Sequence, residues 1–387
     1  MLIIKDTNLF DMNSIYGGKK DILIKDGKIV EIKDNIEIPQ GEEVQVIDAM
    51  NRIVTPGIVE PHCALGIQEQ IYRVEGADSN ESTDPITPQL RGIDAINPED
   101  AGFEMAISAG VTTVVTGPGN INLIGGTFAA IKTSGNTVEE MSIIDELAFK
   151  FSLGNTPKGF YGGKGKMPKT RLGNAAMIRE ALFKARQYHD NLKKYENGES
   201  NTPPTFDMKL HSLSRVFDGM LVKFTAQQAY DIMTAVRIAE EFGLNYTVDK
   251  CSEAYLITED LKRHNVQLVV GASYGGKRTH EVRNQDTVIG RLLEEDNIDF
   301  SISSGHPDIN INLTMIQPIM MVRKGLSREK ALRGMTIDAA RTVGLEDRVG
   351  SIEVNKDADI LIWDGDPLDY YSSPEVVIID GKVVLQK

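Results

Sequence analysis

Alternating apolar and polar residues predict short strands at both ends of the chain. Near the N-terminus the alternation over 22–32 is interrupted by Asp26-Gly27, a pair typical of a two-residue hairpin turn. Near the C-terminus, apolar runs over 358–363 and 376–379 precede a second such turn at 380–381. We therefore predict one small β-sandwich built from both ends of the chain, residues 1–55 and 345–387.

The middle of the chain alternates helical and strand patterns. Four segments with helical spacing of apolar residues are each followed by a short apolar run typical of a buried strand. These helix–strand pairs are 98–109 with 112–115, 226–242 with 246–248, 252–263 with 267–270, and 287–295 with 300–302. Repeated units of this kind favour a parallel sheet, and a (β/α)8 barrel is the usual arrangement for about 280 residues.

The predicted fold class is therefore α/β, a TIM-like barrel over residues 56–344 with the composite β-sandwich beside it. A polar, glycine-rich stretch at about 157–204 interrupts the strand–helix pattern and contains one predicted helix, 174–195. We expect this stretch to be an insertion over one end of the barrel.

Composition and charge exclude several kinds of partner. The chain has 42 basic and 56 acidic residues, a formal charge of −14, and no dense basic segment, which argues against nucleic acid and anionic membranes. No apolar run approaches the roughly 20 residues that span a bilayer, and the N-terminus lacks the features of a signal peptide. The two cysteines, Cys63 and Cys251, are too few for a disulfide framework. We expect a cytoplasmic protein that binds a small molecule.

One segment, TPGIVEPHCALG at 55–66, contains a motif with recognisable chemistry. Side chains two residues apart on a strand face the same side, so His62 and Ala64 point together, and Ala64 has no atom that could bind a metal. Cys63 should point the other way and pack in the core.

The segment is similar to the P-G-x-x-D-x-H-x-H run of the amidohydrolase superfamily, with Glu60 in place of the aspartate. Residues 350–360 resemble the family signature G-x-I-x-x-G-K-x-A-D, with Asn355 in place of a glycine. The chain thus resembles this superfamily, close to the bacterial imidazolonepropionase-like amidohydrolases, over essentially its full length. The resemblance implies a strand-end site for zinc or another divalent metal, hydrolysis of non-peptide C–N bonds in cyclic amides, and an oligomer.

The same resemblance implies which positions would hold the metal, and most of them are substituted. The implied ligands are H-x-H on the first strand, a glutamate in a G-E-N-P-K run, histidines in H-A-H and E-H-G-T-E-G-H runs, and an aspartate on the last strand. In this chain the corresponding residues are His62, Ala64, Asn155, Thr225, Gln227, Lys250, Tyr255 and Gly305. Of these eight, His62 alone keeps an implied ligand.

Such a site would not support the ordinary hydrolytic mechanism. Catalytic zinc needs about three protein ligands, and the ammonium group of Lys250 repels a cation. We therefore predict a catalytically degenerate protein, with no confident metal or cofactor, that binds a small molecule. We expect it to form a homo-oligomer or a mixed oligomer with an active paralogue.

Two other hypotheses remain open. The first is an active hydrolase of non-peptide C–N bonds with an atypical metal site drawn from His62, His280, His306, Asp308 and Glu253. The second is a metal-free enzyme in which Lys250 or Tyr255 reacts. The candidate catalytic residues are therefore Lys250, Tyr255 and His306. Each also has a structural interpretation; for Lys250 it is pairing with Asp249 or Glu253.

Overall fold

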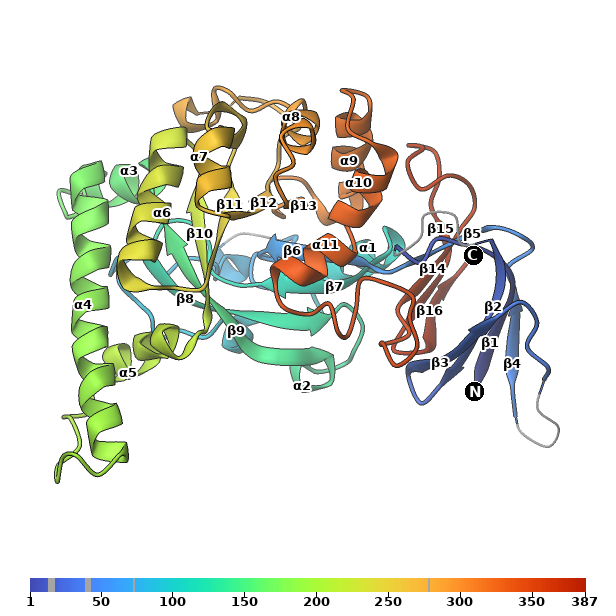
Figure 1. Cartoon of the computed structure of the whole chain (residues 1–387), viewed down its shortest axis with the longest axis horizontal. Coiled ribbons are helices and arrows are strands. Elements are labelled where there is room, and N and C mark those ends of the chain that lie inside the picture. Colours follow the sequence, from blue (N-terminus) through green and yellow to red (C-terminus); the bar gives the residue numbers. More distant parts are fainter. Residues whose placement is uncertain (13–17, 39–42, 72–73, 278) are drawn as a thin grey trace.

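The computed structural model describes residues 1–387 except 13–17, 39–42, 72–73 and 278, and its strands form two separate sheets (Figure 1). The larger sheet curls into a barrel with the strand order β13-β12-β11-β10-β9-β8-β7-β6. Its strands are β6 (Ile58–Cys63), β7 (Val111–Thr116), β8 (Ile124–Lys132), β9 (Ser142–Ser152), β10 (Leu221–Ala226), β11 (Tyr246–Lys250), β12 (Gln267–Val270) and β13 (Phe300–Ile302). The predicted α/β barrel is confirmed.

One barrel strand departs from the predicted parallel arrangement. Strand β8 runs antiparallel to both β7 and β9. Residues 117–123 join β7 to β8 without a crossover helix, and strands joined by so short a connection can only be antiparallel. The prediction of strand–helix units throughout the barrel is therefore wrong for this part of the sheet.

The barrel closes between β13 and β6 through side chains, because these two strands share no ladder of backbone hydrogen bonds in the described sheet. The carboxylate of Glu60 on β6 accepts hydrogen bonds from the hydroxyl of Ser303 and, at 2.8 and 2.6 Å, from the backbone N–H and hydroxyl of Ser304. Ser303 also donates to the His62 carbonyl oxygen at 3.0 Å. This seam holds the first and last barrel strands together just below the end of β6.

Helices cover the outside of the barrel (Figure 1). They are α1 (Ala101–Ser108), α2 (Val138–Met141), α3 (Asn155–Gly163), α4 (Arg171–Glu196), α5 (Met208–Ser214), α6 (Ala229–Phe242), α7 (Thr258–Arg263), α8 (Ile289–Glu295), α9 (Ile316–Val322), α10 (Arg328–Gly334) and α11 (Ile337–Thr342). The predicted insertion contains α3 and the long α4, which lies outside α6 at the edge of the molecule. Among the described helices, none is long and apolar enough to cross a membrane.

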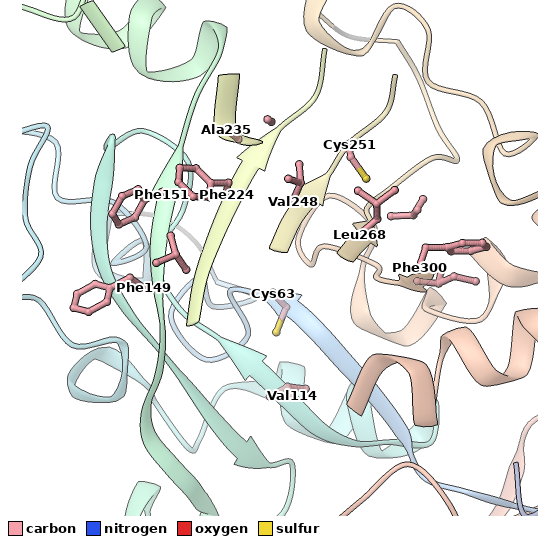
Figure 2. Close-up of a cluster of buried hydrophobic side chains, with 14 of the residues drawn as sticks. Cys63, Val114, Phe149, Phe151, Phe224, Ala235, Val248, Cys251, Leu268 and Phe300 are labelled. Atoms are coloured by element: carbon pink, nitrogen blue, oxygen red, sulfur yellow. The ribbon is translucent and has the colours of Figure 1, made fainter. Parts of the chain in front are cut away.

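Apolar side chains between the barrel strands and these helices form the main core (Figure 2). Helix α6 shows why: its buried residues recur at helical spacing, and the helix ends at Gly243, whose φ of 62° is left-handed. Cys63 and Cys251 both belong to this core. The predicted packing of Cys63, away from the barrel interior, agrees with this position.

The second sheet joins both ends of the chain. Its strands are β1 (Leu2–Leu9), β2 (Lys19–Lys25), β3 (Lys28–Lys33), β4 (Gln45–Asp48), β5 (Ile53–Pro56), β14 (Ile360–Trp363), β15 (Pro374–Ile379) and β16 (Lys382–Gln386). Both predicted Asp-Gly hairpins form, β2 with β3 and β15 with β16. The sheet has a core of its own. The boundaries at 55–56 and 344–345 stay predictions.

A buried ion cluster connects the two sheets. The ammonium of Lys132, at the end of β8, lies 3.0 Å from Asp357, 2.9 Å from Asp359 and 3.2 Å from Asp380. Burial alone would lower the pKa of Lys132, but the three carboxylates outweigh it and raise the pKa. The cluster fixes the barrel against the terminal sheet.

Candidate functional site

Polar side chains fill the barrel interior near the carboxyl ends of β6, β9, β10 and β11, an end that we call the barrel mouth. In the sheet register, Lys150 on β9 lies beside Lys223 on β10, and Thr225 lies beside Asp249 on β11. Because side chains alternate along a strand, Lys223 and Thr225 point to the same side. We call His62, Lys150, Lys223, Thr225 and Asp249 the mouth network.

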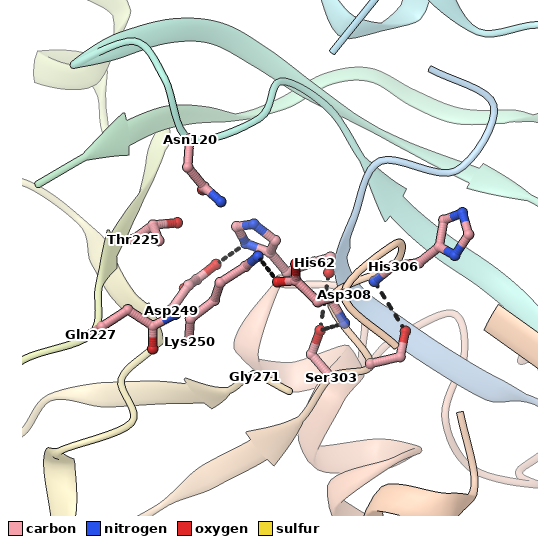
Figure 3. Close-up of polar contacts among 12 residues, drawn as sticks. His62, Asn120, Thr225, Gln227, Asp249, Lys250, Gly271, Ser303, His306 and Asp308 are labelled. Carbon is pink, nitrogen blue, oxygen red and sulfur yellow. Dashed lines mark hydrogen bonds and ion pairs between the residues drawn. The ribbon is translucent and has the colours of Figure 1, made fainter. Parts of the chain in front are cut away.

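Asp249 is the centre of the mouth network. Its carboxylate lies 2.5 Å from Nδ1 of His62 and 2.9 Å from Nζ of Lys223, and it accepts a 2.6 Å hydrogen bond from the Thr247 hydroxyl. Lys223 and Asp249 are both fully buried. Lys223 and His62 outweigh the effect of burial and hold the pKa of Asp249 below its usual range. The carboxylate is therefore charged, and it orients the imidazole of His62 (Figure 3).

Lys150 contacts the other side of the His62 ring. Its Nζ lies 3.3 Å from His62 Nε2, donates at 2.7 Å to the side-chain oxygen of Asn120, and donates to the hydroxyl of Thr225. Among the described residues, none of its hydrogen-bond partners is a carboxylate. Burial, and then the charge of Lys250, hold the pKa of Lys150 well below 10.5. Lys150 is thus a buried amine with uncharged partners.

Lys250 and Asp308 form an ion pair beside the network (Figure 3). Lys250 ends β11 with a left-handed φ of 69°, and Gly271 allows its backbone to approach closely, because a Cβ there would lie 2.8 Å from the Lys250 Cα. The expected partners Asp249 and Glu253 are wrong: Asp249 is held by His62 and Lys223, so Lys250 turns to Asp308. The Asp308 side chain is 52% exposed, whereas that of Lys250 is 9% exposed.

The structure brings some of the predicted positions together. Thr225 belongs to the mouth network, and Gly305 lies against the Lys250–Asp308 pair, where an added Cβ would be 3.6 Å from Cε of Lys250. The backbone N–H of Ala64 donates to the His306 carbonyl at 2.9 Å. These residues all lie around the barrel mouth.

Other predicted positions make contacts elsewhere. The side chain of Asn155 accepts a 3.0 Å hydrogen bond from Arg171, and that of Gln227 accepts one from Ser252. The Tyr255 hydroxyl donates to the Asn284 carbonyl at 3.0 Å. The ring of His306 accepts from the Ile311 N–H and points away from His62 in Figure 3.

The residues present do not fit a divalent metal. In the described part of the chain, no three His, Cys, Asp or Glu residues come together as a possible metal site. The candidates for an atypical site are dispersed: His280 is exposed beside Arg283, and Glu253 accepts from the N–H of Ala229 at the start of α6. At the barrel mouth, lysine Nζ atoms already contact the side chains that a metal ion would need as ligands, namely His62, Asp249 and Asp308.

The sequence motifs did not identify Lys150, Lys223, Asn120 or Asp249 as members of the site. Lys150 and Lys223 do have a signal: each is a lysine flanked by phenylalanine or valine in a buried stretch of its strand. A buried lysine requires a partner or a lowered pKa, so such a residue in a barrel strand indicates a polar barrel interior.

The buried His62 predicts a pH-dependent stability. Burial, reinforced by Lys150, lowers its pKa from 6.5 to about 3. Below the ordinary pKa the unfolded chain binds a proton that the folded chain does not, so the free energy of unfolding decreases as the pH falls from about 6.5 toward 3. We expect this group to account for about 2–3 kcal/mol of lost stability by about pH 4.5.

Urea unfolding of the wild type and of His62→Asn at several pH values measures this loss. The asparagine side chain can still donate a hydrogen bond to Asp249 but does not titrate, so the variant should lose less stability on acidification. Equal losses in the two proteins would contradict the assignment of His62 as a neutral, buried imidazole.

Comparison with known proteins identifies the family. The model of the amidohydrolase family matches residues 185–384. The chain is 26% identical over 396 residues to the amidohydrolase tasK of Hapsidospora irregularis, covering 93% of this chain but only 39% of that protein. It is 22% identical over 374 residues to the imidazolonepropionase of Brucella anthropi, covering 89% of this chain and 86% of that protein.

A solved structure agrees along the whole length. The crystal structure of an amidohydrolase from Thermotoga maritima MSB8 superimposes with a TM-score of 0.95 and 33% identity, and the match covers 100% of both chains. The predicted resemblance is confirmed, and the named relatives are hydrolases. The chain belongs to the amidohydrolase family.

Proposed function

We propose that this chain is a metal-independent member of the family that binds a small molecule at the barrel mouth. One observation supports this most directly: Nζ of Lys150 lies 3.3 Å from Nε2 of His62, the one ligand position that is kept. An amine at that distance occupies the side of the imidazole from which a metal would bind. The adjacent carboxylate of Asp249 is already paired with Lys223.

The chemistry of hydrolysis supports the same proposal. Family-type hydrolysis needs a metal to acidify water and a carboxylate to accept its proton. Gly305 stands at the implied base position, and Asp308 nearby is paired with Lys250. A role in a mixed oligomer with an active paralogue is compatible with this site. The alternative function is hydrolysis of a C–N bond through an atypical metal site. The following experiment distinguishes it from the proposal.

Elemental analysis of protein purified without added metal tests the proposal. We expect far less than one zinc, manganese, iron or nickel ion per chain, and no change in melting temperature after treatment with a chelator. The matched variant His62→Asn should have the same metal content as the wild type. One ion per chain that resists dialysis and is lost in His62→Asn would overturn the proposal.

A further inference from the structure

Two short segments of opposite charge lie next to each other, and each follows the carboxyl end of a barrel strand. Residues 74–84, in the connection after β6, contain four acidic residues and no basic one; we call them the acidic segment. Residues 164–172, which lead from α3 into α4, contain four basic residues and no acidic one; we call them the basic segment. The two meet where Nζ of Lys164 donates to the Ser82 carbonyl at 3.4 Å, and Tyr161 of α3 donates to the Glu81 carbonyl at 3.5 Å.

Most charges of the two segments are not neutralised within the molecule. In the described part of the chain only Asp84 and Arg171 among them form ion pairs, with Lys209 and Asp231. The other charged side chains of the two segments are exposed to solvent: Glu75, Asp78, Glu81, Lys164, Lys166 and Lys169. Each segment therefore presents three free charges of one sign.

The same two segments expose apolar side chains. Of the four most exposed large hydrophobic side chains among the described residues, Val74 (89%) lies in the acidic segment and Leu172 (83%) in the basic segment. A third, Ile71 (79%), lies three residues before the acidic segment. Met167 in the basic segment is 60% exposed. Large apolar groups that stand in water beside unpaired charges are typical of a surface that contacts another protein.

We propose that these two segments form a contact between two copies of this chain, with the basic segment of each copy on the acidic segment of the other. In a two-fold symmetric contact the same surface of both copies is used, so it must be complementary to itself. Because the two segments are neighbours in one molecule, a two-fold axis that passes between them places each segment on its complement. Every ion pair and apolar contact then occurs twice.

A hollow beside the acidic segment provides room for the basic segment of the second copy. Its volume is about 440 Å³, and its charged lining residues are Asp78, Glu81, Asp94 and Arg91. Arg91 already pairs with Glu146 at 3.2 Å, so the hollow keeps an excess of negative charge. A lysine of the second copy would find counter-ions there.

The hollow also borders the mouth network. Pro118 and Gly125 line it, and a Cβ on Gly125 would lie 3.4 Å from Cγ of Lys150. A basic segment seated in the hollow would therefore lie next to the barrel mouth of the other copy.

The distribution of charge favours a second copy over a nucleic acid or a membrane. The chain has a formal charge of −14, and a polyanion that reached the basic segment would also meet the acidic segment beside it. A second copy offers the opposite charge to both segments at once. It also offers the exposed apolar side chains that a polyanion lacks.

Charge reversal on the full-length protein tests the inference. Sedimentation velocity at about 10 µM, a concentration above the Kd of most interfaces of ordinary size, should show the wild type as a dimer. The variant Lys164→Glu/Lys166→Glu/Lys169→Glu should be a monomer, because two acidic segments would then face each other. All three side chains are exposed, so circular dichroism should show that the variant is folded.

A second variant allows a stricter test by mixing. Glu75→Lys/Asp78→Lys/Glu81→Lys should also be a monomer by itself, because two basic segments would face each other. An equimolar mixture of the two variants should form a one-to-one heterodimer, because each reversed segment again meets the opposite charge. Loss of folding in either variant cannot produce this result.

Two further variants serve as controls. Lys25→Glu/Lys324→Glu/Lys382→Glu reverses three exposed lysines on other elements and should leave the dimer intact. Leu172→Ser keeps every charge but removes an apolar contact, and should raise the Kd of the dimer about 10-fold or more.

Three results would overturn the inference: a monomeric wild type, a dimer that persists in either charge-reversed variant, or a mixture that stays monomeric. Binding of poly-L-glutamate to a monomeric wild type would assign the basic segment to a different acidic partner and overturn the inference equally. None of these results depends on metal content, so the inference and the proposed function can fail independently.

Discussion

Asp249→Asn is expected to lower the free energy of unfolding by about 3–5 kcal/mol, because it leaves a buried charge without its counter-ion. Lys223 is fully buried, and the Asp249 carboxylate, 2.9 Å away, is its ion-pair partner. The amide of asparagine can replace the hydrogen bond to His62 but not the negative charge. Urea unfolding at neutral pH, followed by circular dichroism, measures the loss.

Two control variants test whether the unpaired charge of Lys223 causes this loss of stability. The double variant Lys223→Met/Asp249→Asn removes both charges and should recover much of the stability, since a buried ion pair contributes less than the cost of breaking it. Arg263→Ala breaks the exposed Arg263–Asp260 pair and should change stability by less than about 1 kcal/mol. A double variant less stable than Asp249→Asn would contradict this account.

Lys132→Met is expected to lower the free energy of unfolding by a comparable amount, about 3–5 kcal/mol. Here the substitution removes the buried positive charge and leaves the negative charges unpaired. The methionine keeps most of the volume of the lysine stem but leaves Asp357, Asp359 and Asp380 without the ammonium that lies between them. The remaining carboxylates then repel one another across the junction of the two sheets. Thermal unfolding should show a lower melting temperature that partly recovers at low pH, where the carboxylates are protonated.

The matched control is Asp380→Asn. The Asp380 side chain is 45% exposed, whereas the side chains of Asp357 and Asp359 are almost fully buried. Its loss should cost much less, because Lys132 keeps two buried counter-ions, Asp357 and Asp359. If Asp380→Asn is as destabilising as Lys132→Met, the junction depends on something other than the buried lysine.

The fold could be predicted from the sequence where apolar residues recur with a regular spacing along an element. Both Asp-Gly hairpins were visible from the alternation around their turns, and the helix–strand pairs after residue 220 from the helical spacing of apolar residues in each helix and the short apolar run that follows it. Strand β8 was not, since every residue from Ile124 to Lys132 is buried. A strand covered on both faces shows no alternation, and its two glycines weaken the strand signal further.

The position of the site was predictable, but its chemistry was not. The motif around His62 located the barrel mouth and showed that Ala64 lacks a ligand atom, and the resemblance of the last-strand segment did the same for Gly305. The partners of His62 depend on strand register, which places Asp249, 187 residues away, against one ring nitrogen and Lys150, 88 residues away, against the other. The local sequence contains no information on such distant pairings. The pairing of Lys250 with Asp308 was not predicted for the same reason.

The side-chain seam that closes the barrel also sets an order of events during synthesis. Glu60 on β6 and Ser304 just after β13 are 244 residues apart, so the ring stays open until nearly four-fifths of the chain has been made. Until then the Glu60 carboxylate has no seam partner and stays hydrated. A growing chain that ends before residue 303 therefore lacks the groups that join β13 to β6, and a sheet with two uncovered edge strands is prone to aggregation.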